Sequence, residues 1–442
     1  MKTIWIAATL AALAPSARAI AQPGTTQPAA EKDVLTLERA IELAMQQQPS
    51  LRRTRAQIEA SNAQVDIARV IRKPTVTLGT SANVGSRPQR PCSDDPTQIC
   101  AGFFDPNASF SLSVQANWRI FDFGLTRANI RAAELSALAN STALATNVLD
   151  IRRDVETAYL EAVARGRLVK VAEETVKAEE IRLDQARRFV DAQAKDPIEV
   201  AQAQARAANA RSSLAQARSL EAIALANLRA AIGWLDATRS PVVESTWPAP
   251  PPVPPDLVTL VATSRKQRPE LVQLDRQIDA AEASATAAGY RNRPVLAASA
   301  QSNWNPDSLN YTQEPTWSAG ISLSWQVFDG GRASAEQRFA RANVTAARAD
   351  RDSLLVTLTS QLESARAQIV ANAAAVTASE EAVVAARAQV QLADARYAQG
   401  LGSQIELADA QFAVTTAAGN LVQTQWQLAD AWAQLRRALG NS

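Results

Sequence analysis

Histidine is absent from the 442-residue chain, and there are only two cysteines. Without histidine the chain lacks the usual general base and the commonest metal ligand, and two cysteines cannot form a four-thiolate metal site. The 46 basic and 44 acidic residues are interspersed, which argues against a basic nucleic-acid-binding patch. We therefore expect no enzyme, no metal or other cofactor, and no nucleic-acid partner.

Long hydrophobic runs are also missing, with one short exception near the N-terminus. Residues 4–13 are almost entirely apolar, Lys2 precedes them, and Ala-x-Ala patterns end at Ala19 and Ala21. This is typical of a secretory signal peptide over residues 1–21, cleaved after Ala19 or Ala21, and an uncleaved anchor is the alternative. No cysteine lies near the predicted cleavage site, so we expect no lipid anchor there. Because no apolar run of 18 residues follows, membrane insertion has to use β-strands.

Aromatic residues make up only 5% of the chain, although 47% of it is hydrophobic. Much of the apolar content is alanine, which is the best helix former and fills little core volume. The length alone suggests about three globular domains, but this composition favours long helices that pack closely along small side chains.

The chain contains an internal duplication. Pro49 and Pro269 lie in similar surroundings 220 residues apart, and later landmarks such as Trp118 and Trp325 lie 207 apart. We predict a first repeat over residues 22–233, a Pro-rich linker over 234–256 and a second repeat over 257–442. The elements expected in the first repeat are helices 36–73, 126–190 and 197–232 with strands 74–86 and 109–121. Those in the second are helices 257–293, 332–397 and 404–438 with strands 294–304 and 316–328.

The longest predicted helices carry apolar residues at seven-residue spacing, from Leu355 to Tyr397 in the second repeat and from Val148 to Val190 in the first. Such spacing specifies a left-handed coiled coil. A helix over residues 126–190 would be about 98 Å long. Since the neighbouring helices are shorter, we expect two of them stacked end to end beside each long helix.

The predicted strands alternate apolar and small polar residues, most clearly over 110–121 and 317–327. This pattern is typical of a transmembrane barrel with a wet interior, and a half-buried soluble sheet is the alternative. Four strands cannot close a barrel, because the smallest barrels have about eight. The chain therefore has to assemble: three copies give a 12-stranded barrel, and two copies would also close one.

Several duplicated motifs together resemble the TolC family of outer-membrane efflux proteins. They are the Phe-Asp-x-Gly segments at 121–124 and 328–331, the turn at 397–403 and the segment 405–411 that follows it. The resemblance implies a homotrimeric duct with a barrel in the lipid of the Gram-negative outer membrane and a helical tunnel in the periplasm. It also implies a periplasmic adaptor (membrane fusion) protein and an inner-membrane pump, in efflux or type I secretion. A periplasmic coiled-coil adaptor or scaffold without a pore is the alternative function.

The family's periplasmic entrance carries acidic residues on the helix after the second tip turn, which corresponds to Glu406 and Asp409. Three-fold assembly would form rings of carboxylates that favour cations. Ser403 and Glu406 also match a helix capping box, which is the structural alternative for Glu406. Glu199 occupies the equivalent place after the first tip turn, and Tyr397 is expected to link to the hairpin around it.

Two departures from the family concern the tip turns. Gly402 stands where relatives often carry an arginine that ties the entrance closed. The second turn has the Gly400-Leu401 pair on which adaptors dock, whereas the first turn has Gln193 and Ala194 at its tip. The resemblance thus predicts adaptor docking at both tips and puts in question how the closed entrance is held.

Cys92 and Cys100 lie in a longer loop of the first repeat. In an exported protein we expect them to form a disulfide that stiffens an external loop. A metal pair is the alternative, although it lacks other ligands.

Overall fold

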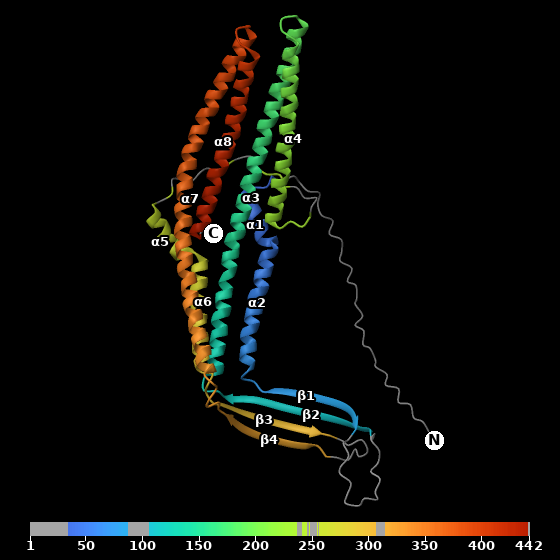
Figure 1. Ribbon diagram of the computed structural model, residues 1–442, viewed down its shortest axis with the longest axis vertical. Coiled ribbons are helices and arrows are strands. Elements are labelled where there is room, and N and C mark those ends of the chain that lie inside the picture. The colour runs from blue at the N-terminus through green and yellow to red at the C-terminus, as the bar shows by residue number, and fades with distance from the viewer. Residues whose placement is uncertain are drawn as a thin grey trace, which may run out of the picture.

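The computed structural model describes residues 34–86, 106–236, 241–244, 247, 254, 256–305 and 314–440. The expected signal peptide, both cysteines and most of the Pro-rich linker lie outside these residues. The described part is a bundle of long helices with one four-stranded sheet at the end opposite the helical tips (Figure 1).

The elements of the first repeat are α1 (Leu37–Gln47), α2 (Pro49–Val70), β1 (Thr75–Ser86), β2 (Pro106–Phe121), α3 (Leu125–Asp191) and α4 (Ile198–Ile232). Those of the second are α5 (Leu257–Gln267), α6 (Pro269–Gly289), β3 (Val295–Trp304), β4 (Thr316–Ser324), α7 (Arg332–Ala398) and α8 (Gln404–Leu439).

Each long helix begins at the Phe-Asp-x-Gly motif. The Asp122 carboxylate accepts a hydrogen bond from the Thr126 backbone N–H at 2.8 Å, and Asp329 accepts one from the Ala333 N–H at 2.7 Å. Each aspartate satisfies a free donor of the first helical turn. Gly124, with φ of 103°, provides a left-handed residue between strand and helix. The motif therefore caps the start of the long helix in each repeat, directly after the sheet.

Helices 36–73 and 257–293, each expected as one element, are in fact two helices each. Gln48 and Arg268 adopt extended backbone conformations with ψ of 121° and 116°, and Pro49 and Pro269 begin new helices. Proline disfavours the helical conformation of the residue before it and cannot donate the missing hydrogen bond. The breaks make room for neighbouring helix ends. A side chain on Gly233 would lie 3.0 Å from the Cα of Gln48, and one on Gly440 would lie 3.0 Å from the Cα of Arg268.

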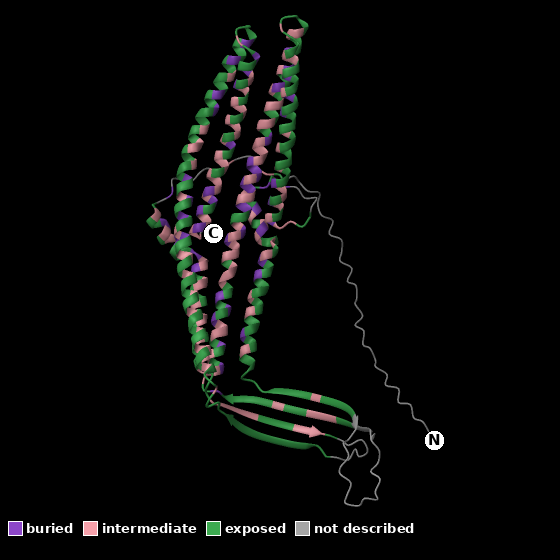
Figure 2. Ribbon diagram, viewed as in Figure 1, coloured by how far each residue is buried: buried purple, intermediate pink, exposed green. Residues whose placement is uncertain are grey.

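Helix α4 thus ends against the start of α2, and α8 ends against the start of α6. Each stacked pair runs beside one 67-residue helix, α3 or α7 (Figure 1). The resulting bundle is thin, and few of its residues are buried (Figure 2). Two apolar cores lie where α1 packs on α3 and α4, and where α5 packs on α7 and α8. Leu160 and Leu228 are buried in the first repeat and Leu362 and Leu435 in the second. Aliphatic residues fill these narrow cores, so few aromatic residues are needed.

The sheet joins the two repeats. Its order is β1-β2-β3-β4, all antiparallel, and β2 of the first repeat pairs directly with β3 of the second. Strand β4 ends at Ser324, four residues before the expected end at 328, because β3 begins at Val295 and offers no partner beyond it. Trp325 instead donates to the Asn292 carbonyl at 3.2 Å. Strands β1 and β4 form the two outer edges.

Among the described helices, α7 contains one 18-residue stretch with a mean hydropathy of 1.3, which is apolar enough to cross a membrane by length and composition. The expectation concerned an uninterrupted apolar run of 18 residues, which α7 does not contain, because residues such as Asn372, Glu380 and Glu381 interrupt its apolar part. In addition, α7 is 67 residues long, or about 100 Å, more than three times the hydrocarbon thickness of about 30 Å. It also packs along α8, so the stretch alone does not make α7 a membrane span.

Candidate functional site at the helical tips

Two tip turns lie at the end of the bundle away from the sheet, one between α3 and α4 and the other between α7 and α8 (Figure 1). Two residues after the end of each long helix, the backbone adopts the left-handed conformation, at Gln193 with φ of 54° and at Gly400 with φ of 74°. The following N–H returns to the last helical turn, Ala194 to Phe189 and Leu401 to Arg396, both at 2.9 Å. The first turn therefore has the shape of the second although it lacks the Gly-Leu pair.

Tyr397 and Glu199 connect the two hairpins. The Tyr397 hydroxyl donates to a Glu199 carboxylate oxygen at 2.9 Å, and Gln404 donates to the Glu199 backbone carbonyl at 3.2 Å. Lys195 lies 3.7 Å from the other carboxylate oxygen and 5.1 Å from the centre of the Tyr397 ring. Phe189 packs edge-on against the same ring. These contacts form the most concentrated link between α3–α4 and α7–α8 at the tips.

Tyr397 is only 6% exposed. Burial, together with the neighbouring Glu199 carboxylate, raises the pKa of its hydroxyl to about 12. The phenol therefore stays protonated at neutral pH and remains a hydrogen-bond donor to Glu199.

Glu406 and Asp409 are exposed on α8. The Ser403 hydroxyl accepts from the Glu406 backbone N–H at 3.1 Å, which is half of the capping box. The Glu406 carboxylate lies 3.5 Å from Arg396 Nε. Asp409 has no ion pair among the residues that the structure describes. Their place in an acidic entrance stays a prediction.

Sequence reasoning missed Arg182. Its guanidinium donates to the Leu407 carbonyl at 3.3 Å and to Gln411 at 3.1 Å. Burial lowers the pKa of Arg182, while the charges of Glu179 and Asp394 oppose the shift. Arg182 thus joins α3 to α8 just below the Tyr397 link. Heptad spacing identifies which face of a helix is buried, but not which distant helix a polar residue on that face meets.

The space around position 402 favours glycine there. A Cβ atom there would lie 3.2 Å from both the Arg396 Cβ and the Tyr397 backbone nitrogen. A larger residue would push against the end of α7, next to the Tyr397 link. In this chain the cationic groups near the link include Lys195, Arg182 and Arg206, which all lie on the first hairpin.

The contacts that join the two hairpins enclose little space. The cavity between Arg182, Tyr397, Gln404 and Leu407 measures about 10 Å³, enough for about one water molecule. Across the described residues no group of three or more histidine, cysteine, aspartate or glutamate side chains is placed to hold a metal. The contacts at the tips therefore connect the two helical hairpins.

Known proteins match the chain in sequence. It is 29% identical to protein CyaE of Bordetella pertussis over 309 residues, which cover 69% of this chain and 62% of CyaE, less than two thirds of that relative. It is 23% identical over 406 residues to the outer membrane efflux protein BepC of Brucella suis, covering 90% of this chain and 85% of BepC.

Solved structures share the fold. The Campylobacter jejuni CmeC outer membrane channel superposes with a TM-score of 0.74, 15% identity and coverage of 95% of this chain and 94% of CmeC. The family model described as outer membrane efflux protein matches twice, over residues 40–234 and 260–441. The two matches correspond to the two repeats and confirm the predicted resemblance, the mainly helical duplicated fold and the outer-membrane location. The chain belongs to the outer membrane efflux protein family.

Proposed function

We propose that three copies of this chain form the passive exit duct of a tripartite efflux or type I secretion system. The observation that carries the proposal is the four-stranded sheet, which is open on both edges and largely exposed at the end of a 67-residue helical wall. Open edges are not tolerated in lipid. Twelve strands from three copies would close a barrel, with the helices continuing it as a tunnel.

The exposed sheet has the chemistry of a lipid-facing wall. Trp317, Ile321 and Leu323 on β4 are 80%, 72% and 65% exposed. They alternate with serines and a glycine along the strand. In a closed barrel the apolar side would face lipid and the small polar side would face water.

The tips supply the gate of this proposed duct. Within each chain, the hydrogen bond from Tyr397 to Glu199 ties the second hairpin to the first. Breaking it would let the α7–α8 hairpin move outward and widen the entrance. Three copies of Glu406 and Asp409 would line that entrance with carboxylates and favour cations.

The proposed partners are a periplasmic adaptor protein and the inner-membrane pump that it recruits. The adaptor would dock on the tip turns, at Gly400 and Leu401 of the second and at Gln193 and Ala194 of the first. Leu401 is 70% exposed, as expected of an apolar residue that contacts a partner protein.

Crosslinking at the tips tests the proposal. Gln193→Cys or Gln399→Cys, with a thiol-reactive crosslinker in cells, should capture a periplasmic adaptor, and the protein should fractionate with the outer membrane and show heat-modifiable mobility. A chain recovered as a soluble periplasmic protein would instead support the scaffold alternative.

A further inference from the structure

A seam of polar contacts runs between α3 of the first repeat and α8 of the second. Thr175 and Thr415 hydroxyls lie 3.1 Å apart, and nearer the middle of the bundle Arg436 forms an ion pair with Glu156. The other contacts along the seam pair Arg182 with Gln411, Arg167 with Gln425, Thr157 with Asp430 and Arg437 with Asp150. The residue numbers of each pair sum to nearly the same value, as expected for two straight antiparallel helices in one register.

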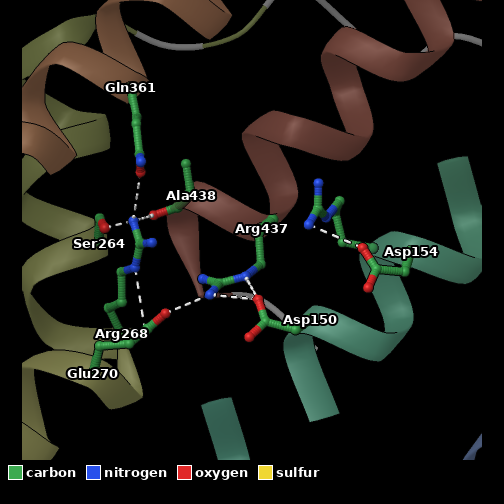
Figure 3. A network of polar contacts seen from close by, with 9 residues as sticks. Asp150, Asp154, Ser264, Arg268, Glu270, Gln361, Arg437 and Ala438 are labelled. Carbon is green, nitrogen blue, oxygen red and sulfur yellow. Dashed lines mark hydrogen bonds and ion pairs between the residues drawn. The ribbon is translucent and has the colours of Figure 1, made fainter. Parts of the chain in front are cut away.

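The seam is strongest where α8 ends against α6. Figure 3 shows Arg437 between Asp150 of α3 and Glu270 of α6. Its Nη2 lies 2.7 Å from the Asp150 carboxylate and 2.5 Å from that of Glu270. Arg268 adds a contact to Glu270 at 3.2 Å and one to the Ala438 carbonyl at 3.4 Å. We call Asp150, Arg268, Glu270 and Arg437 the junction clamp.

The duplication gives each seam position a counterpart 207 residues away. The α3 positions that meet α8 are buried or half-buried: Asp150, Glu156, Thr157, Arg167, Thr175 and Arg182. Their counterparts on α7 are all exposed: Thr357, Glu363, Ser364, Ala374, Ala382 and Gln389. On α4, the counterparts of the α8 positions are exposed except for half-buried Arg229: Gln204, Ala208, Arg218, Ile223, Arg229 and Ala230. Helices α4 and α7 thus carry the two halves of a second seam, on faces that are largely exposed in a single chain.

We infer that α4 of one copy packs against α7 of a second copy in the register of the α3–α8 seam, and that Arg229 pairs there with Glu363 of that second copy. This pair is the counterpart of Arg436 and Glu156, and it is the one ion pair of the seam that the duplication retains. The inference rests on the proposed ring of copies and specifies which residues join them.

The junction clamp has no counterpart in the second seam. Asp150 corresponds to Thr357 and Arg437 to Ala230. With the earlier offset of 220 residues, Arg268 corresponds to Gln48 and Glu270 to Ser50. Where α8 ends against α6, the seam within a chain has the four charged side chains of the junction clamp. At the corresponding place, the seam between copies has uncharged residues at all four positions. The tunnel should therefore loosen between copies before it loosens within a chain.

Charge exchange tests the ion pair in the full-length protein in detergent. Glu363→Arg and Arg229→Glu should each speed trimer dissociation about tenfold, because three seams change together and neighbouring groups couple strongly. The double exchange should restore most of the lost lifetime. Glu381→Arg is the matched control: its first-repeat counterpart Glu174 is exposed and lies outside the seam, so this variant should dissociate at the wild-type rate.

Crosslinking tests the register independently. With Cys92 and Cys100 replaced by serine, Ala230→Cys together with Thr357→Cys should give covalent trimers with a short bis-maleimide, whereas Ala230→Cys with Glu381→Cys should not. A double exchange no better than the single reversals, or equal crosslinking of both cysteine pairs, would overturn the inference. If the wild type forms no trimer and conducts no ions, the proposed function itself fails, which is a separate outcome.

Discussion

At the residue scale, the Tyr397–Glu199 hydrogen bond is the clearest tie between hairpins at the tips. The pKa of Tyr397 is raised from 10.0 to about 12. A raised folded-state pKa means that the stabilisation is complete below about pH 10 and is lost as pH rises through about 12. We expect conductance of the reconstituted channel to be constant from pH 6 to 9 and to rise above pH 10. Tyr397→Phe should give the higher conductance already at pH 7 and lose the alkaline rise that depends on this group.

Gln193 occupies a left-handed conformation that glycine adopts without strain. Gln193→Gly should therefore stabilise the first tip turn by about 1 kcal/mol. Slower hydrogen exchange of the backbone amides of Gln193 and Ala194 would show it. Gln399→Gly is the control, because Gln399 has φ of −86° and gains nothing from glycine. Equal effects of the two changes would contradict the assignment of strain to Gln193.

The same residues show how far sequence reasoning reaches. The family resemblance implies a link from Tyr397 to the hairpin around Glu199, and the two groups are in contact. The capping contact of Glu406 followed from Ser403 three residues earlier, a local pattern. Arg182 could not be assigned, because its partners on α8 lie 225 and 229 residues away in the chain.

At the scale of elements, the junction clamp holds the end of α8 to α3 and α6. Arg437→Gln should lower the free energy of unfolding by about 2–3 kcal/mol, since it leaves the largely buried Glu270 carboxylate without one of its cationic partners. Thermal unfolding of the detergent-solubilised protein would measure the loss. Arg211→Gln is the control, because the Arg211–Glu180 pair is exposed and should be worth less than about 1 kcal/mol. Equal losses would show that the clamp adds no stability.

The boundaries of the elements show where local pattern and tertiary context diverge. The Phe-Asp-x-Gly motifs mark the starts of α3 and α7, because helix capping is decided by neighbouring residues. The end of β4 was expected four residues too late, because its alternating pattern continues past the point where β3 can pair with it. The helices expected over 36–73 and 257–293 are broken at Pro49 and Pro269, where the ends of α4 and α8 occupy the adjoining space.

At the scale of the whole molecule, few aromatics and much alanine are typical of a thin wall, which in the proposed assembly becomes a tube when further copies join it. The lipid-facing side of the proposed barrel gives a direct prediction. Ile321→Lys, on the apolar side of β4, should destabilise the folded protein in lipid by about 2–4 kcal/mol if it lies near the bilayer centre. Ser322→Lys, on the neighbouring position facing the other way, should cost much less. Urea unfolding in lipid vesicles would compare them, and a similar cost for both would contradict a lipid-facing apolar side.

The most direct test of the duct and its acidic entrance is single-channel conductance of the purified protein in a planar bilayer, with a trivalent cation added on the side of the tips. We expect discrete channels that the cation blocks. The Glu406→Gln and Asp409→Asn double variant should conduct normally but require at least about tenfold more cation for the same block, because the carboxylate rings are gone. Channels whose block is unchanged in this variant would contradict the acidic entrance, and absence of channels in the wild type would contradict the duct.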